Sequence, residues 1–184
     1  MADESKRSGV RIYRAADAPN LTQTTYGSRR DFGEYTELKD AAHALAGAAE
    51  TASRLLVNQS EEEGGFSLVY LYFKPNFPLF RHKHEHDCMY VIVSGSAIMG
   101  NQILRAGDCF FVPGMAPYMY TAGPYGIEVI EIRHNVDPEW GFTTIFTKNP
   151  DSRLQEARTA VEENAAAWSK LTTGPLLAAN SRQD

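Results

Sequence analysis

The middle of the chain alternates short apolar runs with turn-forming residues. The runs FSLVYLYF at 66–73 and CMYVIVSG at 88–95 are rich in β-branched, aromatic and leucine residues, which favour strands. Further strand candidates follow at 53–59, 79–84, 97–100, 102–104, 109–113, 117–121 and 126–134. Turn signals such as Gly100-Asn101 separate them. No long helical pattern interrupts 53–134, so the pattern predicts an all-β sandwich or barrel.

The two flanks of this region have a different character. Residues 1–35 are polar without a clear period, and we expect an arm that packs on the domain or a partner subunit, or is partly disordered. Residues 37–50 are rich in alanine and predict a short helix, with Thr36 as its N-cap and Glu37 and Asp40 in its first turn. The expected organisation is an arm and short helix over 1–52, a barrel over 53–136 and a helical extension over 137–184.

An amphipathic helix is predicted near the C-terminal end, from Ser152 to about Thr172. Ser152 with Gln155 fits a capping box, and Gly174-Pro175 ends the pattern. We expect its apolar face to cover the barrel or a dimer interface. Apolar residues recur there at spacings of three and four, namely Leu154, Ala157, Val161, Ala165, Trp168 and Leu171.

Charge and composition narrow the classes of function. The 184 residues carry a net charge of -5, from 18 Lys and Arg against 23 Asp and Glu, which argues against a nucleic-acid partner. No segment reaches the eighteen or so apolar residues that cross a bilayer, and MADESKRSGV lacks the apolar stretch of a signal peptide. Cys88 and Cys109 are too few for a disulfide framework, so we expect a cytoplasmic protein with free thiols.

The pattern His82-Lys83-His84 ends one strand candidate. Residues i and i+2 of a strand point to the same face, so the two imidazoles can converge on one metal ion. Neutral imidazole suits zinc, iron, copper and nickel alike, so the spacing does not choose the metal. The alternative is a pair of polar barrel residues that bind no metal.

Two stretches together resemble the motifs of the cupin superfamily. His82-Lys83-His84, followed by Cys88 and Gly95, resembles the first cupin motif, and Gly107-Asp108, Pro113-Gly114 and Pro117-Tyr118 resemble the second. The resemblance covers roughly residues 66–134. It implies a jelly-roll barrel, often a homodimer, with one metal deep inside.

The chain departs from this family at two ligand positions. The family's glutamate falls on Cys88 and its second-motif histidine on Tyr118, so only His82 and His84 remain of the four usual ligands. Cys88 as thiolate is a sound third ligand, especially for zinc, although a small buried side chain is its default. Tyr118 as phenolate is a less common one. His86 shares the parity of the two histidines but falls in an expected turn.

The final strand candidate leaves two alternatives open. Glu128, Ile130, Ile132 and His134 share one face, whereas Ile127, Val129, Glu131 and Arg133 share the other. If the first face is inside, His134 completes a metal site or acts as an acid or base. If the second is inside, Arg133 binds a substrate carboxylate with Glu131 beside it.

The resemblance implies a metal-dependent enzyme that acts on a small organic molecule, foremost a dioxygenase. His82 and His84 would hold one divalent metal, with iron before zinc, copper, nickel or manganese, while Tyr118 or His134 orients substrate or moves a proton. Cys88, Arg133 and Tyr120 are the expected pocket residues. The alternatives are a metal-free or zinc lyase, isomerase or cyclase, and a non-catalytic small-molecule-binding protein.

Overall fold

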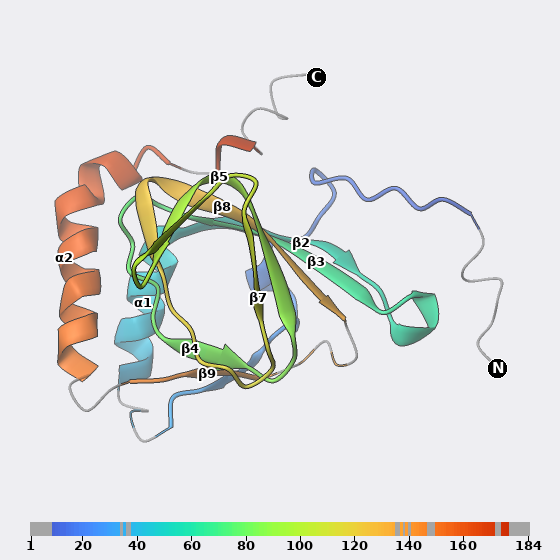
Figure 1. Cartoon of the computed structure of the whole chain (residues 1–184), viewed down its shortest axis with the longest axis horizontal. Helices are drawn as coiled ribbons and strands as arrows, with labels where there is room; N and C mark the ends of the chain where they lie inside the picture. The colour runs from blue at the N-terminus through green and yellow to red at the C-terminus, as the bar shows by residue number, and fades with distance from the viewer. Residues whose placement is uncertain are drawn as a thin grey trace.

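A computed structural model describes residues 9–33, 35, 38–134, 137, 139, 141–146, 150–171 and 174–176. The expected cap Thr36, the first-turn Glu37 and the tail 177–184 lie outside the described residues. The all-β class is confirmed, because the described chain is mostly strand, arranged in two sheets that face each other. Figure 1 looks into the barrel, with the two helices on one side of it.

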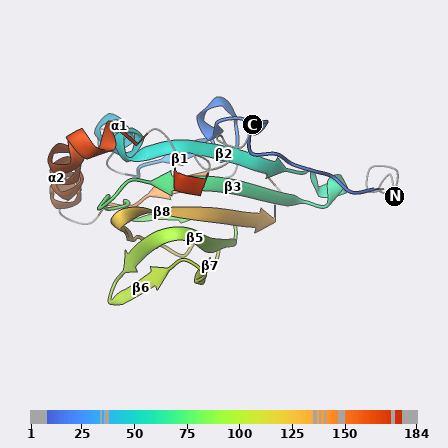
Figure 2. The same ribbon diagram turned by 90° about the horizontal axis from the view of Figure 1, so that it is seen from above.

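The larger sheet has six strands and is antiparallel throughout. Its order is β2 (Glu50–Asn58), β3 (Phe66–Phe73), β8 (Thr121–His134), β5 (Cys88–Met99) and β6 (Gln102–Arg105), with β7 (Cys109–Val112) also paired to β5. Figure 2 shows these strands in that order from one edge to the other. The β3 strand has the bounds that its apolar run predicted.

Two differences from the expected strands have a common cause in glycine. The runs at 88–95 and 97–100 form the single strand β5, and the gap between the strands expected at 117–121 and 126–134 lies inside β8. At Gly95 and Gly126 the backbone has φ values of 73° and 81°, which favour glycine. A Cβ at Gly95 would collide with the Gly126 carbonyl, so the two strands pass closely without ending. The segment 117–121 makes isolated bridges, His82 to Tyr118 among them, before β8 begins.

The smaller sheet joins parts of the chain that lie far apart. Its order is β1 (Arg29–Asp31), β9 (Gly141–Thr144) and β4 (His82–His84). The β9 strand pairs parallel with β1 and antiparallel with β4, with Phe142 opposite both Arg30 and His84. The expected organisation placed β1 and β9 outside the barrel, whereas both flanks supply strands to it. A three-residue strand needs such partners, because its backbone polar groups are otherwise unpaired.

The helices cover one side of the barrel. The α1 helix (Lys39–Ala49) lies where the alanine-rich run predicted it, and α2 (Pro150–Trp168) begins two residues before the expected cap Ser152. Leu154, Ala157 and Trp168 are buried, as the apolar spacing predicted, and the Trp168 ring lies 6.3 Å from Phe77. Lys74 joins the helices to the sheet by donating to the Ala48 carbonyl at 2.7 Å. Among the described residues, no helix is long and apolar enough to cross a membrane.

Candidate functional site

A cavity of about 340 Å³ lies between the two sheets. The larger sheet contributes Val69, Leu71, Phe73, Tyr90 and Glu131, and the smaller contributes His82, His84, Phe142 and Thr144. The arm closes another side with Leu21, Thr22, Tyr26 and Phe32. Most of these side chains are apolar or aromatic, as is usual for a site that binds a small molecule.

His82 and His84 point into the cavity from β4, as their spacing predicted, and both are buried. The His82 ring stacks on Phe142 at 4.6 Å between ring centres. Its Nδ1 lies 2.7 Å from the Phe80 carbonyl oxygen, which can only accept a hydrogen bond. The neutral ring of His82 therefore carries its proton on Nδ1.

The register of β8 decides between the two alternatives for its faces. Glu131 is paired with Val69 on β3 and with Tyr90 on β5, and these residues all face inward. Arg133 shares this face and donates from Nε to Glu131 Oε1 at 2.6 Å, forming an ion pair that is almost completely buried. Burial lowers the pKa of Arg133 to about 10, which still leaves the guanidinium charged at neutral pH.

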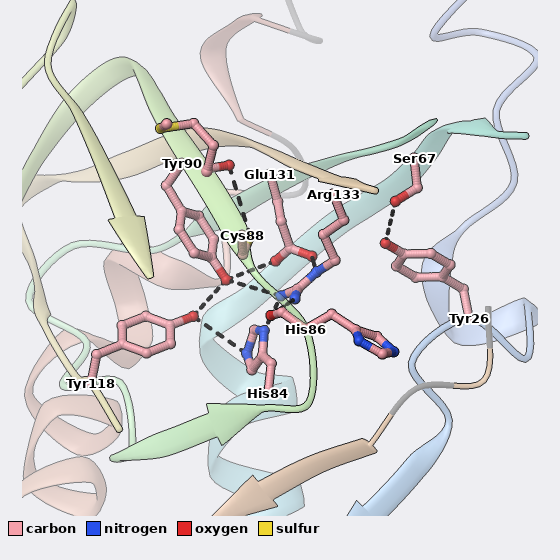
Figure 3. A network of polar contacts seen from close by, with 10 residues as sticks. Tyr26, Ser67, His84, His86, Cys88, Tyr90, Tyr118, Glu131 and Arg133 are labelled. Carbon is pink, nitrogen blue, oxygen red and sulfur yellow. Dashed lines mark hydrogen bonds and ion pairs between the residues drawn. The ribbon is translucent and has the colours of Figure 1, made fainter. Parts of the chain in front are cut away.

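The other nitrogens of Arg133 are also engaged (Figure 3). One terminal nitrogen donates to the His86 carbonyl at 3.2 Å. The other contacts His84 Nδ1 and lies 3.4 Å from the Tyr90 hydroxyl. Because a guanidinium only donates, His84 Nδ1 must accept. The neutral ring of His84 therefore carries its proton on Nε2, the opposite assignment to His82.

A chain of hydrogen bonds runs from His84 to Glu131. His84 Nε2 lies 3.4 Å from the Tyr118 hydroxyl, which lies 2.5 Å from the Tyr90 hydroxyl. Tyr90 donates to Glu131 Oε2 at 2.9 Å, so Tyr118 in turn donates to Tyr90. Burial and the nearby Glu131 charge raise the pKa of Tyr90 and of Tyr118 well above the ordinary value. Both phenols therefore stay protonated at neutral pH.

The second motif places Tyr118 through a close backbone approach. The Gly114 amide donates to Asp87 Oδ1 at 2.7 Å, and a Cβ at Gly114 would lie 2.7 Å from the Glu85 carbonyl oxygen. A side chain at Gly114 would push this loop away from β4. Tyr118 and His82 then exchange backbone hydrogen bonds of 2.9 and 3.0 Å. The motif glycine thus holds the tyrosine against the histidine strand.

The cavity residues do not fit the metal that the resemblance implies. Two histidines that hold a metal through Nε2 must both have the proton on Nδ1. His82 meets this condition, but a proton on His84 Nδ1 would face the N–H groups of Arg133. Cys88 directs its Sγ to the Met89 carbonyl and is not among the residues that line the cavity, and the Tyr118 hydroxyl is hydrogen-bonded to Tyr90, so neither completes a set of ligands around His82 and His84.

A second group of metal-ligating side chains lies outside the cavity. Glu85, His86 and Asp137 each offer a ligand atom, and these atoms lie within 4.8 Å of one another. Arg29 already joins the two carboxylates, at 2.6 Å from Glu85 and 2.7 Å from Asp137. The Arg29 guanidinium takes the position that a metal cation would occupy between the two carboxylates. These ion pairs therefore hold the arm against the turn after β4.

Several expected site residues lie elsewhere. His134 is exposed on the outer face of β8, with its ring 6.4 Å from Phe66, which corrects its expected role in the cavity. Arg133 is not among the residues that line the cavity, and its guanidinium is bonded to Glu131. This position corrects the expectation that Arg133 contacts a substrate carboxylate. Cys88 is buried and directs Sγ to the Met89 carbonyl at 3.8 Å. Tyr118 and Tyr120 do line the cavity.

Sequence reasoning missed three residues of this site. Tyr90 follows Cys88 by two positions, so strand parity would have placed it on the same face as Cys88. Tyr26 and Phe142 carry no local signal, because they reach the cavity through the smaller sheet and the arm.

Comparison with known proteins points to one fold. No family model matches the sequence, and no curated protein matches it. The polyketide cyclase RemF from Streptomyces resistomycificus aligns with a TM-score of 0.50 and 16% identity over 82% of this chain and 98% of that one. An RmlC-like cupin from Shewanella frigidimarina aligns with a TM-score of 0.38 and 23% identity over 44% and 72%. KdgF from Halomonas sp. aligns with a TM-score of 0.40 and 21% identity over 46% and 79%. At this level of identity the likeness to RemF shows a shared fold alone, and the two sheets that face each other are the all-β barrel that the sequence predicted.

Proposed function

We propose that this protein is a metal-independent enzyme that moves a proton on a small, neutral, aromatic molecule, in the manner of an isomerase, lyase or cyclase. The observation that carries the proposal is the contact of Arg133 with His84 Nδ1. This contact directs the His84 proton toward Tyr118 and starts the chain that ends on Glu131.

The charge balance of the cavity supports a neutral ligand. Glu131 is the one formally charged side chain among the described residues that line it, and its charge is met by Arg133. An ionic ligand would lose its water without gaining a counter-charge, which is costly. Rings such as those of Phe73, Phe142 and Tyr120 favour a planar aromatic ligand.

The chain supplies a balanced route for a proton. A proton leaving a carbon or oxygen of the substrate passes to the Tyr118 hydroxyl as that group's own proton moves to Tyr90. In the same concerted step the Tyr90 proton moves to Glu131 Oε2, 2.9 Å away, and the electron pair of the broken bond stays on the substrate. His84 Nε2–H donates to the Tyr118 oxygen and stabilises the negative charge that develops on it as Tyr118 passes its proton on. Return of the proton to another atom completes isomerisation, ring closure or elimination without oxidation.

The dioxygenase favoured by the two motifs is the competing function. It needs His84 Nε2 as a metal ligand, and the contact with Arg133 disfavours that state. The fold neighbour RemF is described as a polyketide cyclase, an activity within the class proposed. The homodimer expected from the resemblance stays a prediction.

The test is proton exchange in D₂O with a panel of neutral aryl ketones, followed by NMR. We expect the wild-type protein to exchange the proton next to the carbonyl in the presence of a chelator. Tyr118→Phe should lose about 10²–10⁴-fold of this rate, whereas Tyr125→Phe, at an exposed tyrosine, should keep it. Exchange that requires an added metal and disappears in a His82→Ala/His84→Ala protein would overturn the proposal. Ligand binding without exchange would reduce the protein to a binding module.

A further inference from the structure

A second cavity of about 400 Å³ adjoins the first, beneath the N-terminal arm. The arm forms one wall with residues between Ile12 and Pro19, and β2 forms another with Leu55, Leu56 and Asn58. Among the described residues, Tyr26 alone lines both cavities. We infer that Tyr26 sets the length of the molecule that the main cavity accepts. Only the class of ligand, a small neutral aromatic molecule, is taken from the proposed function.

The Tyr26 ring is held firmly at this boundary. It is 4% exposed and packs with Leu55 and Val69. Its hydroxyl lies 2.6 Å from Ser67 Oγ, which is completely buried on β3. Figure 3 shows the ring beside Arg133 and His86, with its hydroxyl turned to Ser67.

The arm that carries Tyr26 is itself fixed in place. Thr24 donates from Oγ1 to the Leu21 carbonyl at 2.8 Å, and the Tyr26 amide donates back to Thr24 Oγ1 at 3.3 Å. Gly27 follows with φ of 58°, which lets the arm turn toward β1. The ring therefore behaves as a wall of the cavity.

Removing the ring would join the two spaces. The second cavity also has charged and polar lining residues, among them Arg14 and Asp17. A ligand with its aromatic head near His84 would therefore extend an apolar tail along the side formed by Leu55 and Leu56. Each methylene buried there adds about fourfold in affinity, from roughly 0.8 kcal/mol per group. In the wild-type protein this gain should stop at the length that reaches Tyr26.

The experiment is a calorimetric affinity series of 4-alkylphenols, from ethyl to nonyl. We expect a length limit in the wild-type protein and the same limit in Tyr26→Phe, which keeps the ring. Tyr26→Ala should move the limit outward, with about a fourfold gain for each added methylene. In that background Ala18→Phe, which fills the second cavity, should bring the limit back.

The outcomes separate this inference from the proposed function. An unchanged limit in Tyr26→Ala would overturn the role of Tyr26 and leave the proton-transfer proposal standing. Short phenols that do not bind the wild-type protein would overturn the proposed ligand class instead. If Tyr26→Ala does not fold, Tyr26→Leu keeps an apolar side chain against Val69 and must move the limit in the same direction.

Discussion

Strand β8 buries two glutamates on opposite faces, and their surroundings differ. Glu131 faces the cavity, pairs with Arg133 and accepts the Tyr90 proton. Glu128 is 0% exposed on the outer face, where Oε1 accepts from the Tyr70 hydroxyl at 2.5 Å and the Leu176 amide at 2.8 Å. Within the described part of the chain, Glu128 has no ion pair and its Oε2 has no hydrogen-bond partner.

The two carboxylates differ in what they can reach. The inner carboxylate has a fixed cation on one side and a relay of phenols that reaches an open cavity on the other. The outer carboxylate is sealed under residues 174–176, where a Cβ at Gly174 would collide with the Tyr70 hydroxyl. We therefore expect Glu131 to exchange protons with a ligand and Glu128 to hold the C-terminal segment on the sheet.

The largest expected effect is the loss of the inner charge. Glu131→Gln leaves the buried Arg133 charge uncompensated and should lower the free energy of unfolding by about 3–5 kcal/mol. The matched Glu128→Gln leaves no cation without a counter-charge and should change the free energy of unfolding by about 1 kcal/mol or less. Urea unfolding followed by circular dichroism measures both.

A double variant sharpens the same comparison. Glu131→Leu with Arg133→Met removes both charges, so most of the lost stability should return. Equal losses in the two glutamine variants would contradict the distinction between the inner and outer sites.

The contribution of a single buried tyrosine to the pH dependence of stability should be a smaller effect, and it is expected on both faces. Burial raises the pKa of several acids in the fold, so the folded chain keeps protons that the unfolded chain releases. Their contribution is complete below the unfolded pKa values of about 9 and 10 and is lost as pH rises above them. Arg133 and Lys74, whose pKa values are lowered, act in the opposite sense but are fewer. The acids with raised pKa are Cys88, Tyr70, Tyr72, Tyr90 and Tyr118.

The free energy of unfolding should therefore fall from about pH 9 upward. Each such acid contributes up to about 1.4 kcal/mol per pH unit once its unfolded counterpart has ionised. Tyr118→Phe should reduce the slope by that amount above pH 10, because it removes one acid whose pKa is raised in the folded chain. Urea unfolding between pH 8 and pH 11 gives the slopes, and an equal slope for wild type and Tyr118→Phe would contradict the raised pKa.

The sequence predicted most of the barrel because its strand signals are local. The apolar run 66–73 became β3 with the same bounds, and the parity of His82 and His84 put both side chains in the cavity. The parity of β8 also separated Glu128 from Glu131. It left the inner face undecided, because each face carries apolar residues and a glutamate.

The parts that escaped prediction depend on contacts distant in sequence. The β4 strand is completed by β9, and Arg133 reaches His84 across 49 positions. No local pattern marks either contact. The motifs favoured a metal because two histidines at the spacing of His82 and His84 can converge on one ion. Arg133 changes this interpretation. Its contact with His84 exists only in the folded structure, where the two sheets face each other.

The central claim is that Arg133 fixes the His84 proton on Nε2, and ¹⁵N NMR of histidine-labelled protein tests it most directly. At neutral pH we expect His84 to show a protonated Nε2 and an accepting Nδ1, while His82 shows the reverse. Added zinc or ferrous iron should leave both patterns unchanged, and Arg133→Met with Glu131→Leu should allow His84 to change tautomer. A wild-type His84 with its proton on Nδ1, and with Nε2 shifted by one equivalent of metal, would contradict the account.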